Sequence, residues 1–274
     1  MRIKLVAAAA ILAATTGQAV ESQPVPTPPA LSYADLADLA LSAPIVAHVR
    51  VADADRLDAE LAPNVPAGHR RFLVEADVVA LIRGSGGIEG RVSYLVDMPA
   101  DSRLRRRSEH LVLARRAPNR PAMLQLVAPD AQLPYTPEAA ERLRAILREA
   151  GAAGAPARIT GIGRAFHVPG SLAGESETQI FLQTHDERPI SLNVLRRPGE
   201  QPRWSVALSE MVDEAAAPPA PDTLLWYRLA CTLPARLPGD VLREAGSEEA
   251  QAIQADYRLV IEGLGPCTRS RARR

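Results

Sequence analysis

The chain has 274 residues, of which 32 are basic, 32 are acidic and 47% are hydrophobic. This composition excludes wholesale disorder and suffices for one large domain or two ordinary ones. Because the charges balance and aromatic residues make up only 4%, the chain offers neither a global basic field nor a stacking platform for single strands, and no nucleic-acid partner is expected.

Residues 1–19 have the order of a secretory signal peptide. Arg2 and Lys4 give a positive start, residues 5–14 are apolar, and small residues precede a cut after Ala19. A short buried helix is the alternative. Since no later stretch reaches the about 20 apolar residues of a spanning helix, we expect a mature chain without a transmembrane segment, in the periplasm or secreted.

Residues 20–31 are predicted to be a tether, because four prolines within residues 24–29 exclude a helix. Ser32 then fits a helix N-cap. Asp35, three residues later, suits a capping box, so the sequence predicts a helix over residues 33–41 that ends before the next proline.

Strand signals follow, and the first three alternate apolar and polar side chains, which is typical of half-buried antiparallel strands. The predicted strands lie at 45–51, 71–78, 92–96, 111–113 and 123–127. His48 and Arg50 fall on the polar face of the first strand, so we expect His48 to face solvent. The glycine-rich residues 84–90 complete neither a phosphate loop nor a dinucleotide fingerprint, and they are interpreted as a flexible connection.

A second helix is predicted to begin at Thr136 and Pro137 and to end at Gly151. The small, uncharged residues 151–156 are the best candidate for a domain boundary. We therefore expect one domain at 32–151 and another at 152–274.

The second half repeats the alternation and ends in helices. Its predicted strands lie at 158–168, 178–184, 190–195 and 204–212, with a hairpin turn at 185–189. Asp222 is predicted to cap a helix that reaches Leu233. Ser247 is predicted to cap the last helix, with Gly263 just past its end.

The chain contains two cysteines, Cys231 and Cys267. In an oxidising compartment we expect one disulfide between them, which fastens the C-terminal helix to the preceding one. Closing this loop should stabilise the fold by roughly 3–4 kcal/mol in the chain-entropy model. Two buried free thiols are the alternative.

Several segments of the first half carry a resemblance to a known architecture. They are APIVAHV at 43–49, FLV at 72–74, VVALIRG at 78–84, and the strands at 92–96 and 111–113. With these segments, residues 42–150 resemble the netrin-like or tissue-inhibitor-like variant of the OB barrel. The metalloprotease-inhibitor branch of that family chelates zinc through an N-terminal Cys, which is missing here, so inhibition of that kind is not implied. The expected fold is α+β, with a small OB-like antiparallel β-barrel and a helix, followed by a second antiparallel sheet with C-terminal helices.

The histidines do not predict a metal site, because three or four ligands must converge and no HxH or HxxxH pair occurs. The five are His48, His69, His110, His167 and His185. The densest cluster, His185 with Asp186 and Glu187, has the polar character of a turn. No metal, cofactor or catalytic residue is predicted.

Residues 170–177 contain two serines close to glycines, so we compare them with the motif of a nucleophilic serine. Neither arrangement fits the G-x-S-x-G elbow. A triad of Ser176, His185 and Asp186 can be imagined, but it requires a geometry that the sequence does not supply. The leading hypothesis is thus an exported, non-enzymatic binding or accessory protein of the bacterial cell envelope. A periplasmic hydrolase that uses His167 or His185 is the alternative, and a purely structural envelope protein is a third option.

Four arginines, Arg103, Arg105, Arg106 and Arg107, form a basic segment that could contact polyanions. The partner would be an anionic envelope polymer or another envelope protein. A solvated loop is the alternative, and Asp101 dilutes the charge of the segment.

Overall fold

A computed structural model of the chain describes residues 31–208 and 217–271. The predicted signal peptide, the tether up to residue 30 and the end of the strand predicted at 204–212 lie outside the described residues. Leu31–Arg274 is one compact unit, so the predicted boundary at 151–156 stays a prediction. Within the described ranges, no helix is long and apolar enough to cross a membrane.

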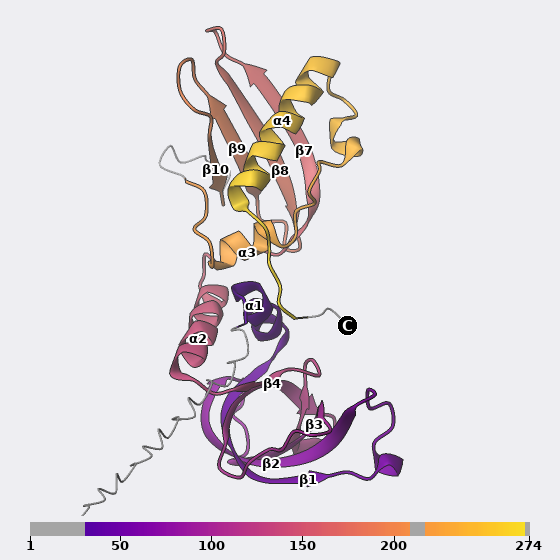
Figure 1. Ribbon diagram of the computed structural model, residues 1–274. Coiled ribbons are helices and arrows are strands. Elements are labelled where there is room, and N and C mark those ends of the chain that lie inside the picture. The colour runs from indigo at the N-terminus through magenta and orange to yellow at the C-terminus, as the bar shows by residue number, and fades with distance from the viewer. Residues whose placement is uncertain (1–30, 209–216, 272–274) are drawn as a thin grey trace, which may run out of the picture. The chain divides into compact units, whose positions relative to one another are not determined.

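The first part of this unit is a closed barrel (Figure 1). Its strands are β1 (Ile45–Arg56), β2 (His69–Arg83), β3 (Arg91–Pro99), β4 (Glu109–Ala117) and β5 (Arg120–Leu126), and β6 (Gln132–Pro134) extends one edge of β4. The strand order is β1-β2-β3-β5-β4, and β4 pairs with β1 to close the barrel. The expectation of wholly antiparallel strands is wrong at one place. Strands β3 and β5 are parallel, because β4 follows β3 in the chain yet lies on the far side of β5.

Successive side chains of β1 point alternately to the inner and the outer face of the barrel wall, and both faces are buried. Ile45, Ala47 and Val49 point into the barrel and pack with Tyr94, so side chains fill the interior. The outer face is also covered, because helices pack against it, and Val46 is fully buried there.

The expectation that His48 faces solvent is therefore wrong. Its side chain lies on the outer face of β1 but is only 7% exposed. Tyr135 stacks on the imidazole at a centroid distance of 3.7 Å, and Glu109 bonds to Nε2 at 2.9 Å. A period of two identifies the outer face but not the residue that covers it.

Two helices cover the barrel wall, α1 (Tyr33–Ser42) and α2 (Pro137–Gly151). Their predicted starts are confirmed. Ser32 and Asp35 form the capping box, and the Thr136 hydroxyl oxygen accepts a hydrogen bond from the N–H of Ala139. Leucines of both helices pack with Leu111 of β4 in one cluster.

The second sheet is antiparallel, as expected, and has the order β10-β9-β8-β7. Its strands are β7 (Ile159–Pro169), β8 (Ser176–Thr184), β9 (Ile190–Arg196) and β10 (Arg203–Ala207). Helix α4 (Ser247–Leu264) packs on one face of this sheet, as Figure 1 shows. The predicted hairpin turn connects β8 to β9. Together, the barrel and this sheet establish the α+β class.

The predicted boundaries of the last two helices are wrong. Helix α3 (Leu224–Ala230) is shorter than expected and is capped by Thr223 rather than Asp222. The N-cap of α4 is Gly246, not Ser247. Gly263 lies inside α4, where a Cβ would approach the indole nitrogen of Trp204 to 2.5 Å, and Gly265 with φ +70° ends the helix instead.

A candidate binding groove under a C-terminal strap

Residues 265–271, which we name the C-terminal strap, run from the end of α4 to α1 (Figure 1). The strap is fixed covalently near its start. Cys267 is bonded to Cys231, the C-cap residue of α3, with the sulfur atoms 2.12 Å apart, which confirms the predicted disulfide. The strap therefore joins the C-terminal helix to both α3 and α1.

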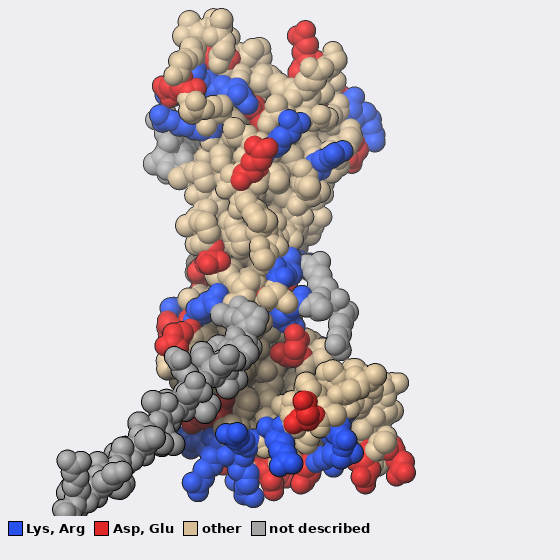
Figure 2. Space-filling model, in the orientation of Figure 1, with Lys and Arg blue, Asp and Glu red and all other residues tan. Residues whose placement is uncertain are grey.

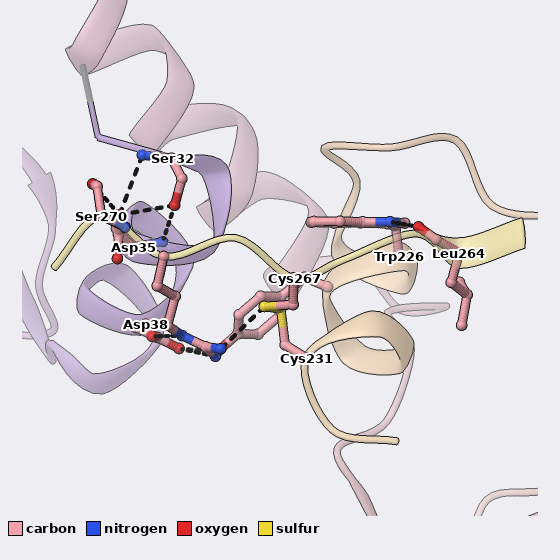
Figure 3. The surroundings of a disulfide bond; sticks show 10 residues. Ser32, Asp35, Asp38, Trp226, Cys231, Leu264, Cys267 and Ser270 are labelled. Atoms are coloured by element: carbon pink, nitrogen blue, oxygen red, sulfur yellow. Dashed lines mark hydrogen bonds and ion pairs between the residues drawn. A yellow bond between two sulfur atoms is a disulfide. The ribbon is translucent and has the colours of Figure 1, made fainter. Parts of the chain in front are cut away.

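The strap ends on the buried carboxylate of Asp35 (Figure 3). Ser270 donates from its backbone N–H at 2.8 Å and from its hydroxyl at 2.6 Å, and the N–H of Arg271 donates at 3.3 Å. The same carboxylate serves the capping box of α1 through Ser32. Burial by itself raises the pKa of Asp35, but these hydrogen bonds outweigh burial and hold the pKa below its usual value.

A second carboxylate of α1 holds the middle of the strap. Asp38 accepts hydrogen bonds from Arg269 Nε at 2.7 Å and from the Tyr227 hydroxyl at 2.6 Å. Burial, and then the bond to Asp38, raises the pKa of Tyr227 to about 12, so this phenol stays a donor. Farther along, Arg271 Nε donates to Asp130 at 2.7 Å. Every strap arginine described is thus paired with an aspartate.

A groove of about 650 Å³ lies between the strap, α1 and the barrel. Val96, Met98 and Pro99 of β3 line it together with Ala128 and Pro129. This volume is within the roughly 300–1,000 Å³ of small-molecule sites. The groove thus combines an apolar floor with the paired charges of the strap.

Among the residues that line the groove, one buried side-chain atom has no hydrogen-bond partner within the described part of the chain. The side-chain oxygen of Gln132 is buried and accepts no hydrogen bond. His69 lies at the β2 side of the lining, where its Nδ1 is 3.1 Å from the carbonyl oxygen of Ala67. The groove therefore presents an apolar surface beside paired charges, a combination found in ligand sites.

The predicted basic segment is separate from this groove. Arg103, Arg105, Arg106 and Arg107 lie in the loop between β3 and β4, and all are exposed. Arg106 Nη1 is 3.9 Å from a carboxylate oxygen of Asp53. On the face drawn in Figure 2, basic and acidic side chains lie next to one another at the lower end of the view. The segment remains a candidate contact for polyanions.

The histidines do not converge. His185 lies on an exposed turn with Nδ1 3.9 Å from Asp186, while burial lowers the pKa of His110. Among residues 31–208 and 217–271, no group of three or more potential ligands is placed to hold a metal. The nine-residue strand β8 separates Ser176 from His185 by roughly 30 Å, so the imagined triad does not form.

His167 belongs to a buried network that sequence reasoning missed. Its Nδ1 is 2.8 Å from Thr178 Oγ1, and the Thr178 hydroxyl donates to Asp256, which is only 1% exposed. Arg196 Nε donates to the same carboxylate at 2.8 Å. Because Thr178 has one hydroxyl hydrogen and gives it to Asp256, His167 Nδ1 must donate to Thr178, which leaves a lone pair on Nε2 in the neutral ring.

The sequence contains one signal for this network, an acidic residue on the apolar side of the last helix. Asp256 precedes Tyr257 on the buried side of α4 and follows Ile253 by three residues. A carboxylate on an apolar stripe requires buried partners, and these come from β8 and β9. The pattern could have identified Asp256 as buried, but not His167 as the residue linked to it.

No protein-family model matches the chain, and no curated protein matches it. The netrin-like resemblance of residues 42–150 therefore stays a prediction, since the strand order of the barrel describes the fold alone.

Proposed function

We propose that this protein is an exported, non-enzymatic binding or accessory module of the bacterial cell envelope, and that it binds its ligand in the groove under the C-terminal strap. The groove of about 650 Å³ is the observation that carries the proposal. Buried side chains fill the barrel interior, so we place ligand binding on the outer surface.

The position of the groove supports this function. Its floor comes from the end of β3, and His69 comes from the start of β2. In five-stranded Greek-key barrels the face formed by strands two and three commonly binds ligands, a likeness that concerns the fold alone.

The lining indicates the kind of ligand. Met98, Pro99 and Pro129 favour a ligand with an apolar body. The charges of the strap are already paired with aspartates, so a strongly charged ligand would have to displace an ion pair. We therefore propose an uncharged, partly apolar segment of an envelope protein or polymer.

The experiment is affinity capture from an envelope extract by the tagged mature protein, with mass spectrometry of the proteins and glycans retained. His69→Trp fills the groove at its edge, and His185→Trp places the same ring on a remote exposed turn. We expect the wild type and His185→Trp to retain the same material and His69→Trp to lose it. Equal retention by all three proteins would exclude the groove.

The His167 network supports a second candidate, a periplasmic hydrolase. A shallow groove of about 560 Å³ beside His167 includes Ser247 and Glu249, and the lone pair on Nε2 suits a general base. If the protein is non-enzymatic, His167→Gln and wild type should hydrolyse p-nitrophenyl acetate at the same background rate. A rate at least about tenfold above background that His167→Gln abolishes, and His185→Gln preserves, would favour the hydrolase.

A further inference from the structure

We infer that the Cys231–Cys267 bond is a directed thiol-exchange site for an external dithiol, in which Cys231 is attacked, Cys267 leaves, and the strap is released. The two sulfur atoms have different surroundings. Arg269 Nη1 lies 3.0 Å from Cys267 Sγ, whereas none of the described guanidinium groups bonds to Cys231 Sγ (Figure 3).

The guanidinium favours Cys267 as the leaving group. A neighbouring cation stabilises a thiolate and lowers the pKa of the thiol, and a thiol of lower pKa leaves faster in exchange. Asp38 binds Nε and Nη2 of Arg269 and orients the group, so Nη1 is directed to the sulfur. The Asp38 carboxylate offsets part of the positive charge of Arg269, but the Nη1–H group still donates to Cys267 Sγ.

The reaction balances with a dithiol as reductant. Its thiolate attacks Cys231 Sγ, the Cys231–Cys267 bond breaks, and the electron pair moves to Cys267 Sγ. The second thiol then attacks the mixed disulfide and expels Cys231 as a thiolate. The dithiol is oxidised to a disulfide, and the protein gains two electrons and two protons as two thiols. Both cysteines are partly exposed, and the exchange requires that the thiol reach Cys231 Sγ from the side opposite Cys267.

Exchange changes the strap, because the disulfide is its covalent anchor. After reduction, hydrogen bonds and ion pairs from Arg269, Ser270 and Arg271 hold the described part of the strap to α1 without a covalent link to α3. Arg269 and Arg271 also line the groove, so release of the strap removes one wall. This consequence for binding rests on the proposed function; the exchange chemistry does not.

The direction of exchange is tested by treating the oxidised mature protein with glutathione, quenching with acid and mapping the adduct by mass spectrometry. We expect glutathione on Cys231 at least about fivefold more often than on Cys267. Arg269→Gln should remove this preference. Arg271→Gln is the matched control, because it loses an ion pair of the strap without touching sulfur.

Equal labelling of both cysteines, a preference for Cys267, or adducts that form only at the rate of global unfolding would overturn the exchange site. Strap release has its own readout, trypsin cleavage after Arg269. Dithiothreitol should speed this cleavage at least about tenfold while the fold persists, and an unchanged rate contradicts release. If adducts and cleavage behave as expected but affinity capture by the reduced protein is unchanged, the exchange site stands and the groove function fails.

Discussion

At the scale of single residues, Asp35 connects both ends of the described chain. Its carboxylate caps α1 through Ser32 and receives the strap through Ser270, although it is fully buried. A buried carboxylate is tolerated only when hydrogen bonds replace its hydration. The strap supplies these bonds, so Asp35 couples helix capping to the attachment of the C-terminus.

The lowered pKa of Asp35 makes its contribution to stability depend on pH. The contribution is complete above the unfolded-state pKa and is lost as the pH falls through the lower folded-state pKa. We expect Asp35→Asn to reduce the free energy of unfolding by about 1.5–3 kcal/mol at pH 7, and the difference from wild type to shrink below pH of about 4. Urea unfolding at several pH values measures it. Asp55→Asn, at an exposed position, is the control and should change little.

At the scale of elements, the loop between β3 and β4 carries four exposed arginines. Arg106 lies 3.9 Å from a carboxylate oxygen of Asp53, and its side chain is exposed as well. Exposed ion pairs contribute little to stability, so these arginines are available to a polyanion at little cost to the fold.

Replacement of Arg103, Arg105, Arg106 and Arg107 by Gln tests this contact. Each basic residue near an anionic surface contributes about 1 kcal/mol, so binding to phosphatidylglycerol liposomes at low salt should weaken at least about tenfold. The matched control replaces four exposed arginines elsewhere, Arg158, Arg164, Arg197 and Arg203, with the same charge change. Equal binding by both variants and wild type in a flotation assay would exclude the polyanion contact.

At the scale of the whole molecule, the disulfide and the strap join elements that are remote in sequence. Arg269 and Asp38 are 231 residues apart, and Arg271 bonds to Asp130 across 141 residues. The indole N–H of Trp226 adds a bond of 2.8 Å to the carbonyl oxygen of Leu264 at the end of α4. The C-terminal residues thus stabilise the start of the fold.

Export is the prediction that belongs to the whole chain. If residues 1–19 are a signal peptide, protein recovered from the periplasm should begin at Val20 and contain the disulfide. Intact mass spectrometry before and after reduction measures both the N-terminal residue and the disulfide, since reduction of the disulfide adds the mass of two hydrogens. A periplasmic protein that retains Met1, or one whose cysteines are both alkylated without reduction, would contradict the prediction.

Local features were predictable from the sequence. The caps at Ser32 and Thr136 and the turn after Thr184 depend on neighbouring residues, so their signals are contained in short segments. The cysteine pair also followed from composition, because two cysteines allow only one intramolecular bond. The boundaries that failed belong to the last two helices. At Gly263 the helix continues beside Trp204, a neighbour that is remote in sequence.

Only the tertiary structure decided which surfaces meet. Hydrophobic alternation indicates that a strand has two different faces. It does not predict which strand pairs with that strand or which residues cover its faces. The parallel pairing of β3 with β5, the burial of His48 under Tyr135 and the attachment of the strap to Asp35 all join residues remote in sequence. Such contacts depend on the packing of the complete chain, and for this reason the groove could not be predicted from any single segment.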